Sequence, residues 1–165
     1  CEEQVLTSGQ VGVEEGLVGD QPDFLAGGGK LFPEGEARFP VLRDQTLADG
    51  IMDAAILRVY EKRFKEPKYR DPAWDAYQAA KMDRGLKHFE DNTPQAPATA
   101  ADVNAGSLTL ACALGYLDIR FAGEWRQTHP KLVAWLDAFE AAVPAFTDTK
   151  VPPAPVPDNA PALLQ

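Results

Sequence analysis

The chain has 165 residues, of which 45% are hydrophobic, which is enough for one well-packed core. Its net charge of -9 and its pI of about 4.7 mean that phosphate backbones and anionic membrane surfaces repel it on average, so we expect no nucleic-acid partner. The longest uncharged apolar run, around residues 105–117, is shorter than the roughly 20 residues that cross a bilayer, so no membrane span is predicted.

The first 26 residues predict a short β-hairpin followed by a helix. Residues 4–6 and 11–13 are β-prone runs separated by Ser8 and Gly9, which form a turn signal. Residues 14–25 then carry apolar side chains at helical spacing. Three consecutive glycines at 27–29 are too flexible for a helix interior and lack the Lys-Ser/Thr of a phosphate-binding loop. They are interpreted as a linker into a helical domain over residues 27–150.

Two long helices are expected next. The first begins near Glu36, has Pro40 in its first turn and bends near Gly50. The second covers residues 72–92. The apolar residues predicted to pack inward in the first helix are Phe39, Leu42, Leu47, Ile51, Ala55 and Leu57. In the second helix, one side is predicted to carry Trp74, Tyr77, Ala80, Met82 and Leu86, with charged residues on the other.

The connection between these helices, residues 60–70, is a dense basic stretch in an acidic chain. One interpretation is an anion site. The other, which we favour, is a solvated helix end whose cations interact with the negative pole of the helix dipole.

The stretch from Val103 to Asp118 predicts a capped and buried helix. Asn104 can accept a hydrogen bond from the amide of Ser107 while the Ser107 hydroxyl reaches back, which is a capping box. The following residues are apolar nearly all round, as in a helix enclosed by others. Cys112 within it is therefore interpreted as a small packing residue.

Neither the cysteines nor the histidines indicate a metal or redox site. Cys1 and Cys112 have no ligand or redox spacing, and His88 and His129 have no Cys, Asp or Glu at ligand spacing. We interpret both histidines as structural or exposed. The Pro-rich residues 151–165 are interpreted as an extended tail, separate from the helical domain.

The order of these segments resembles the glutathione S-transferase family. Residues 31–33 and 38–55 resemble the opening of its all-helical C-terminal domain, and residues 103–118 resemble the central buried helix of that domain. Residues 125–139 resemble its last principal helix. The resemblance implies a mainly α fold: a C-terminal-like helical bundle preceded, in residues 1–26, by the partial end of a thioredoxin-like domain.

The resemblance also implies a function. A complete protein would conjugate glutathione, as co-substrate, to a small hydrophobic electrophile in detoxification. The family's final thioredoxin-like strand is followed by an acid and a serine that hold glutathione, and these positions correspond to Glu14 and Glu15. No residue corresponds to the family's thiolate-stabilising Ser, Tyr or Cys. Four positions correspond to the electrophile pocket: Thr46, Asp49, Asp53 and Leu57.

Further expectations follow from the family. It pairs subunits through the first two long helices and the first domain, so we expect a homodimer. The sequence shows no signal peptide, which favours a cytoplasmic location; the alternative is a removed leader, because the chain also lacks an initiator Met. The chain is either part of a longer protein or has a degenerate first domain. In the second case, the alternative function is a non-catalytic interaction or scaffold module.

Overall fold

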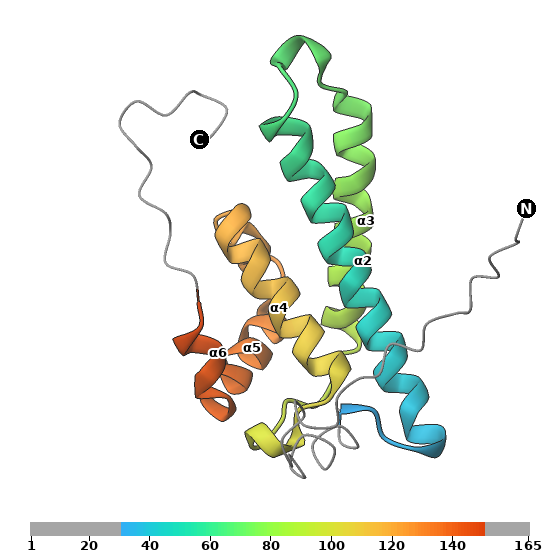
Figure 1. The fold of residues 1–165 in the computed structure, drawn as a ribbon, viewed down its shortest axis with the longest axis vertical. Coiled ribbons are helices and arrows are strands. Elements are labelled where there is room, and N and C mark those ends of the chain that lie inside the picture. The colour runs from blue at the N-terminus through green and yellow to red at the C-terminus, as the bar shows by residue number, and fades with distance from the viewer. Residues whose placement is uncertain (1–30, 151–165) are drawn as a thin grey trace, which may run out of the picture.

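The structure, a computed structural model, describes residues 31–150, which fold into helices with no strand among these residues (Figure 1). The predicted hairpin and helix of residues 1–26, the glycine linker and the Pro-rich tail lie outside the described residues. The helical elements in chain order are η1 (Gly35–Ala37), α2 (Arg38–Arg63), η2 (Pro67–Tyr69), α3 (Pro72–Asp91), η3 (Ala100–Asp102), α4 (Ala105–Arg120), η4 (Glu124–Gln127), α5 (Pro130–Ala142) and α6 (Pro144–Asp148).

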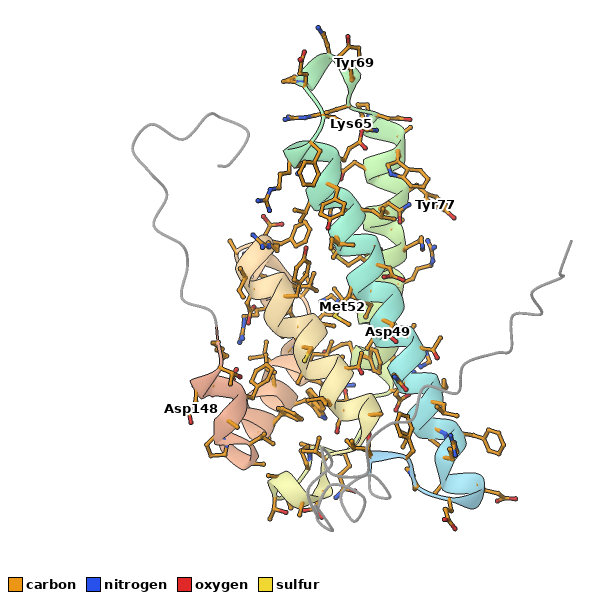
Figure 2. All side chains as sticks on the ribbon, viewed as in Figure 1. Asp49, Met52, Lys65, Tyr69, Tyr77 and Asp148 are labelled. Carbon is orange, nitrogen blue, oxygen red and sulfur yellow. The ribbon has the colours of Figure 1, made fainter. Side chains whose placement is uncertain are left out.

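Helices α2 and α3 form an antiparallel hairpin whose tip carries the basic stretch (Figures 1 and 2). The buried carboxylate of Glu61 accepts hydrogen bonds from the backbone amide of Asp71, at 2.7 Å, and from Lys65 Nζ, also at 2.7 Å. Arg70 donates to the carbonyl oxygens of Lys62 and Lys65, which belong to the last turn of α2 and the residues after it. These hydrogen bonds fix the conformation of the tip, and they use backbone groups at the helix ends that have no partner within the helix.

The start of α3 is fixed by its own cap. The Asp71 side chain accepts hydrogen bonds from the amides of Ala73 and Trp74, and Pro72 occupies the first helical position. An aspartate cap followed by proline is a strong helix start because the proline lacks only an amide that would be unpaired there.

Helix α4 begins with the predicted capping box. The Ser107 amide donates to Asn104 Oδ1 at 2.9 Å, and the Asn104 amide donates to Ser107 Oγ at 3.0 Å. A Cβ atom at Gly106 would lie 3.0 Å from both the carbonyl oxygen of Val41 and Cβ of Asp44. The missing side chain thus lets α4 approach α2 closely at this end.

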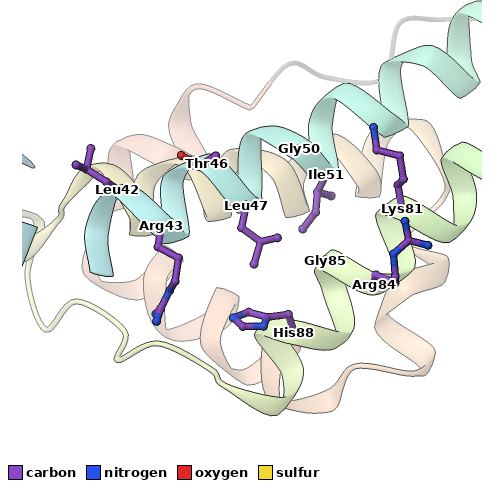
Figure 3. Close-up of a pocket in the computed structure, with 10 residues that line it drawn as sticks. All are labelled: Leu42, Arg43, Thr46, Leu47, Gly50, Ile51, Lys81, Arg84, Gly85 and His88. Atoms are coloured by element: carbon purple, nitrogen blue, oxygen red, sulfur yellow. The ribbon is translucent and has the colours of Figure 1, made fainter. Parts of the chain in front are cut away.

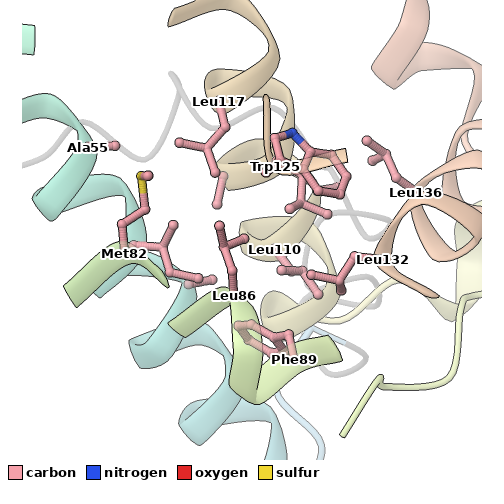
Figure 4. Packing of buried hydrophobic residues seen from close by; sticks show 14 of the residues in the cluster. Ala55, Met82, Leu86, Phe89, Leu110, Leu117, Trp125, Leu132 and Leu136 are labelled. Carbon is pink, nitrogen blue, oxygen red and sulfur yellow. The ribbon is translucent and has the colours of Figure 1, made fainter. Parts of the chain in front are cut away.

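The core is built around α4, which lies between α2 and the C-terminal helices (Figures 1 and 4). The largest fully buried apolar side chains come from every long helix: Ile51 from α2, Leu86 and Phe89 from α3, Leu110, Leu114 and Leu117 from α4, and Leu132, Leu136 and Phe139 from α5. Asp118 at the end of α4 accepts hydrogen bonds from Trp125 Nε1, at 2.9 Å, and from Arg126. These bonds connect the polar end of α4 to η4.

The inward packing predicted for two residues of α2 is wrong, because Phe39 is 71% exposed and Leu57 is also exposed. The apolar side predicted for α3 is divided: Met82 and Leu86 are buried, whereas Trp74, Tyr77 and Ala80 are exposed. Cys112 is likewise exposed rather than packed within the bundle. The reason is that helical periodicity locates an apolar stripe but does not state whether an element of the same domain covers it. No helix in residues 31–150 is long and apolar enough to span a membrane.

Candidate functional site

The four positions predicted for the electrophile pocket share one exposed face of α2. Thr46, Asp49, Asp53 and Leu57 follow one another at intervals of three or four residues, and all four are exposed. This spacing places them in one row along the helix. Their common placement on one face is compatible with a shared surface. Whether this surface receives an electrophile stays a prediction.

The same row continues to the end of α2 with two aromatic residues. Tyr60 is 45% exposed and Phe64 is 70% exposed, and their rings meet edge to face with centroids 5.0 Å apart. Figure 2 shows α2 passing from Asp49 and Met52 toward the tip at Lys65 and Tyr69. The row therefore changes from polar in its middle to aromatic at its end.

Tyr116 lies on α4 and is partly buried. The guanidinium of Arg120, one turn further along α4, lies 5.8 Å from the centre of the Tyr116 ring. Burial raises the pKa of the Tyr116 hydroxyl, and Tyr60 raises it further. The positive charges of Arg120 and Arg63 lower it, but the pKa remains above its ordinary value. Tyr116 is therefore protonated at neutral pH and available as a hydrogen-bond donor.

A separate groove lies between α2 and α3 (Figure 3). It has a volume of about 690 Å³, and Gly50, Ile51 and Gly85 are among the residues that line it. A Cβ atom on Gly85 would lie 2.5 Å from Cγ1 of Ile51, so the glycine allows the two helices to approach. Thr46 is the one predicted pocket residue that also lines this groove.

The groove is basic although the chain is acidic. Arg43, Lys81, Arg84 and His88 line it, and no Asp or Glu is among its lining residues. Arg43 pairs with Asp44, whereas Lys81 and Arg84 form no ion pair within residues 31–150. Our sequence reasoning missed this cluster, although the spacing of 81, 84 and 88 on one helix face was a visible signal.

The remaining candidate residues do not form a reactive centre. His129 Nδ1 lies 3.0 Å from the carbonyl oxygen of Trp125, at the start of α5, and His88 lies in the groove. Although Cys112 is exposed by its surface area, neighbouring side chains partly desolvate its thiol and raise its pKa, so the nucleophilic thiolate is disfavoured there. Among residues 31–150, no three His, Cys, Asp or Glu side chains gather as metal ligands. Glu14 and Glu15 lie outside the described residues.

Comparison with known proteins identifies the domain. The sequence model of the family described as "Glutathione S-transferase, C-terminal domain" matches residues 46–138, which include most of α2 and all of α3 and α4. A comparison with curated proteins gives no match.

Solved structures give the same result. A glutathione transferase family member from Pseudomonas fluorescens Pf-5 with bound glutathione is 37% identical, with a TM-score of 0.66 over 74% of this chain and 59% of that chain. A structure of a Pf-5 family member with bound S-(propanoic acid)-glutathione is 35% identical, with a TM-score of 0.65 over 74% of this chain and 62% of that one.

A glutathione S-transferase from Methylobacterium radiotolerans in complex with glutathione sulfonate is 28% identical, with a TM-score of 0.62, and the match covers 79% of this chain and 62% of that one. This chain thus spans about three-fifths of the length of these structures. The family model alone covers more than half of the 165 residues. The chain therefore belongs to the glutathione S-transferase family, and its described helices form the C-terminal domain.

Proposed function

We propose that the protein conjugates glutathione to small hydrophobic electrophiles, a detoxification reaction, with glutathione as co-substrate. One observation carries the proposal: structures 35% and 37% identical to this chain hold S-(propanoic acid)-glutathione and glutathione. The thiolate of glutathione attacks an electrophilic carbon, a C–S bond forms, and the leaving group departs with its electron pair. The thiol proton passes to water.

The exposed face of α2 is the proposed wall of the electrophile pocket. No helix of residues 31–150 covers this face, because all four of its proposed pocket residues are exposed: Thr46, Asp49, Asp53 and Leu57. Glu14 and Glu15 are the proposed glutathione contacts. The Glu14 carboxylate would accept a hydrogen bond from the amine of the γ-glutamyl group. Glu15 occupies the position of the family's serine, and its negative charge would repel a substrate carboxylate.

A calorimetric titration of glutathione into the native full-length protein and into Glu15→Ser tests this site. We expect Glu15→Ser to bind about fivefold more tightly, corresponding to about 1 kcal/mol, because a hydrogen bond to a charged group replaces a like-charge contact. Equal affinities would show that Glu15 does not occupy the serine position. If neither protein binds glutathione, the non-catalytic interaction or scaffold module becomes the better interpretation.

We further propose a homodimer whose interface includes α2 and α3. Trp74 is 41% exposed and Tyr77 is 56% exposed on α3, and their rings stack with centroids 5.9 Å apart. Exposed aromatic side chains of this kind are enriched in protein interfaces. Light scattering at micromolar concentration should give twice the chain mass, and Trp74→Ala combined with Tyr77→Ala should shift the population toward monomer. A monomeric native protein would contradict this interface.

The proposed location is the cytoplasm. Cys112 is a free thiol on the exposed side of α4, and exposed free thiols persist best in a reducing compartment. Fractionation of cells that express the full-length protein, followed by immunoblotting, tests this proposal. Recovery in a secreted or membrane fraction would contradict it.

A further inference from the structure

The basic side chains of the groove between α2 and α3 are divided between its two ends (Figure 3). Arg43 lies near the start of α2 and His88 near the end of α3, which is the same end of an antiparallel hairpin. Lys81 and Arg84, one turn apart on α3, line the groove nearer the tip. Along α3, the distance from Lys81 to His88 is about 10 Å at the helical rise of 1.5 Å per residue. The groove thus has basic groups at both ends, a fixed distance apart.

The part of the groove between these ends is apolar. Leu47 and Ile51 line it from α2, and Gly85 lines it from α3. The Leu47 side chain is partly exposed, so it can contact a ligand, and no Asp or Glu is among the residues that line the groove. A cleft lined by charges of one sign, with walls of low dielectric constant, concentrates the electric field and attracts ions of opposite charge. The groove therefore favours a ligand that is anionic at its ends and apolar in its middle.

The cations of the groove are poorly compensated by the described part of the chain. Lys81 and Arg84 have no acidic partner within residues 31–150, and Lys81 is partly buried. Arg43 lies 2.9 Å from the carboxylate of Asp44, but its side chain is 62% exposed, and such exposed pairs contribute little free energy. Like charges that line one cleft repel each other unless an anion lies between them. A bound anion would remove this repulsion.

We propose that this groove binds an elongated dicarboxylate, a molecule whose two carboxylates are joined by an apolar spacer. Lys81 and Arg84 bind one carboxylate, and Arg43 and His88 bind the other. Guanidinium groups suit this role because they are always charged and donate paired hydrogen bonds to planar carboxylates. His88 donates through a ring nitrogen. The site is separate from the proposed glutathione contacts and shares only Thr46 with the proposed electrophile pocket.

Glutathione also carries two carboxylates, but the groove suits it less well. The γ-glutamyl amine is a cation, and no acidic side chain lines the groove to accept it. The peptide bonds between its carboxylates would lose hydrogen bonds to water against Leu47 and Ile51. We therefore expect a dicarboxylate with a hydrocarbon spacer to bind here without competition from glutathione.

Calorimetric titration of three carboxylates into the native full-length protein tests the proposal. Sebacate has two carboxylates joined by an unbranched hydrocarbon chain. Decanoate has a carbon chain of the same length with one carboxylate, and succinate has two carboxylates joined by a short chain. We expect sebacate to bind at least about tenfold more tightly than decanoate or succinate, because only sebacate reaches both ends of the groove. Equal affinities for sebacate and decanoate, or no saturable binding of sebacate, would overturn the proposal.

Variants at one end of the groove test which cations are used. Lys81→Gln/Arg84→Gln should weaken sebacate binding about tenfold and so remove its advantage over decanoate. Arg43→Gln should weaken it less, because a carboxylate already pairs with this arginine. As a matched control, Lys68→Gln/Lys87→Gln removes two cations from exposed ion pairs outside the groove and should bind sebacate within about twofold of the native affinity. If the control loses binding as well, the effect belongs to the overall charge and the proposal is wrong.

A further variant fills the groove without removing a charge. A Cβ atom at Gly50 would have no other atom within 4 Å, so Gly50→Leu adds a side chain in open space at the groove. It should keep its helical circular dichroism and bind sebacate at least about tenfold more weakly, because the added side chain occupies the ligand's place. Unchanged binding by this folded variant would contradict the proposed location.

A competition titration separates this site from the proposed activity. Saturating glutathione should change the affinity of the native protein for sebacate by less than about twofold, because the two ligands bind at different places. Displacement of sebacate by glutathione would show that both use one site and would overturn this proposal. A protein that binds sebacate but neither binds nor conjugates glutathione would support this proposal and overturn only the proposed function.

Discussion

Helices α4 and α2 lie side by side but differ in how the domain uses them. The central residues of α4, such as Leu110 and Leu114, are fully buried between α2, α3 and α5. Helix α2 buries Ala48, Ile51 and Ala55 on one side and leaves the row from Thr46 to Phe64 exposed on the other. The difference indicates that α4 serves the stability of the domain, whereas the outer face of α2 is available for ligands or for other parts of the protein.

The largest expected effect comes from the core side of this comparison. Leu114→Ala should lower the free energy of unfolding by about 2 to 5 kcal/mol, because it removes a fully buried side chain and leaves a cavity. Leu108→Ala on the same helix is the control, because Leu108 is 41% exposed. This variant should lose much less unfolding free energy. Urea unfolding followed by circular dichroism measures both. Equal losses would mean that α4 is not enclosed as described.

The packing of α2 on α3 predicts a difference between two glycines that line the same groove. A methyl group at Gly85 would meet Ile51 at 2.5 Å, while one at Gly50 would have no atom within 4 Å. Gly85→Ala should therefore be less stable than Gly50→Ala by about 1 to 3 kcal/mol because of overpacking. Gly50→Ala alone should gain up to about 1 kcal/mol from helix propensity. Comparison of their urea midpoints tests this, and two equally stabilised variants would contradict it.

The cap of α4 should contribute less than its core. Asn104→Ala removes the acceptor of the Ser107 amide and should cost about 1 kcal/mol in unfolding free energy. Asn104→Asp keeps an acceptor at the same position and is the matched control. Thermal unfolding of the three proteins measures the difference. A silent Asn104→Ala would show that solvent or another group satisfies this helix end equally well.

The smallest expected effect concerns the α2–α3 tip and depends on pH. Hydrogen bonds from Lys65 and from the Asp71 amide lower the pKa of Glu61 below its ordinary value of 4.5. A lowered folded-state pKa means that the stabilisation is fully present above the unfolded-state pKa and is lost as the pH falls through the folded-state pKa. The stability difference between the native protein and Glu61→Gln should therefore be constant above about pH 5.5 and shrink below the ordinary pKa of 4.5.

Urea unfolding between pH 2.5 and 7 measures this difference. Lys65→Gln removes the principal hydrogen-bond donor to Glu61 and should raise the pKa of Glu61 toward its ordinary value. The stability of this variant should therefore depend less on pH, between about pH 2.5 and 5, than that of the native protein. A difference that grows as the pH falls would contradict the proposed role of Glu61.

Local sequence signals accounted for much of the helical domain. The capping box at Asn104 and Ser107 is confirmed, and the helix predicted over residues 72–92 matches α3 at Pro72–Asp91. These features depend on residues three or four positions apart, so the chain specifies them locally. The inward packing predicted for Phe39 and Leu57 was wrong for the opposite reason. An amphipathic stripe is the same in sequence whether a helix of this domain or something else covers it.

The candidate sites show the same division. The family resemblance pointed to Thr46, Asp49, Asp53 and Leu57 as pocket residues, and helical spacing predicts that they share one face of α2. The basic groove between α2 and α3 was decided only by tertiary structure. Arg43 on α2 and Lys81 on α3 are separated by dozens of residues, and only the packing of one helix against another sets which side chains meet.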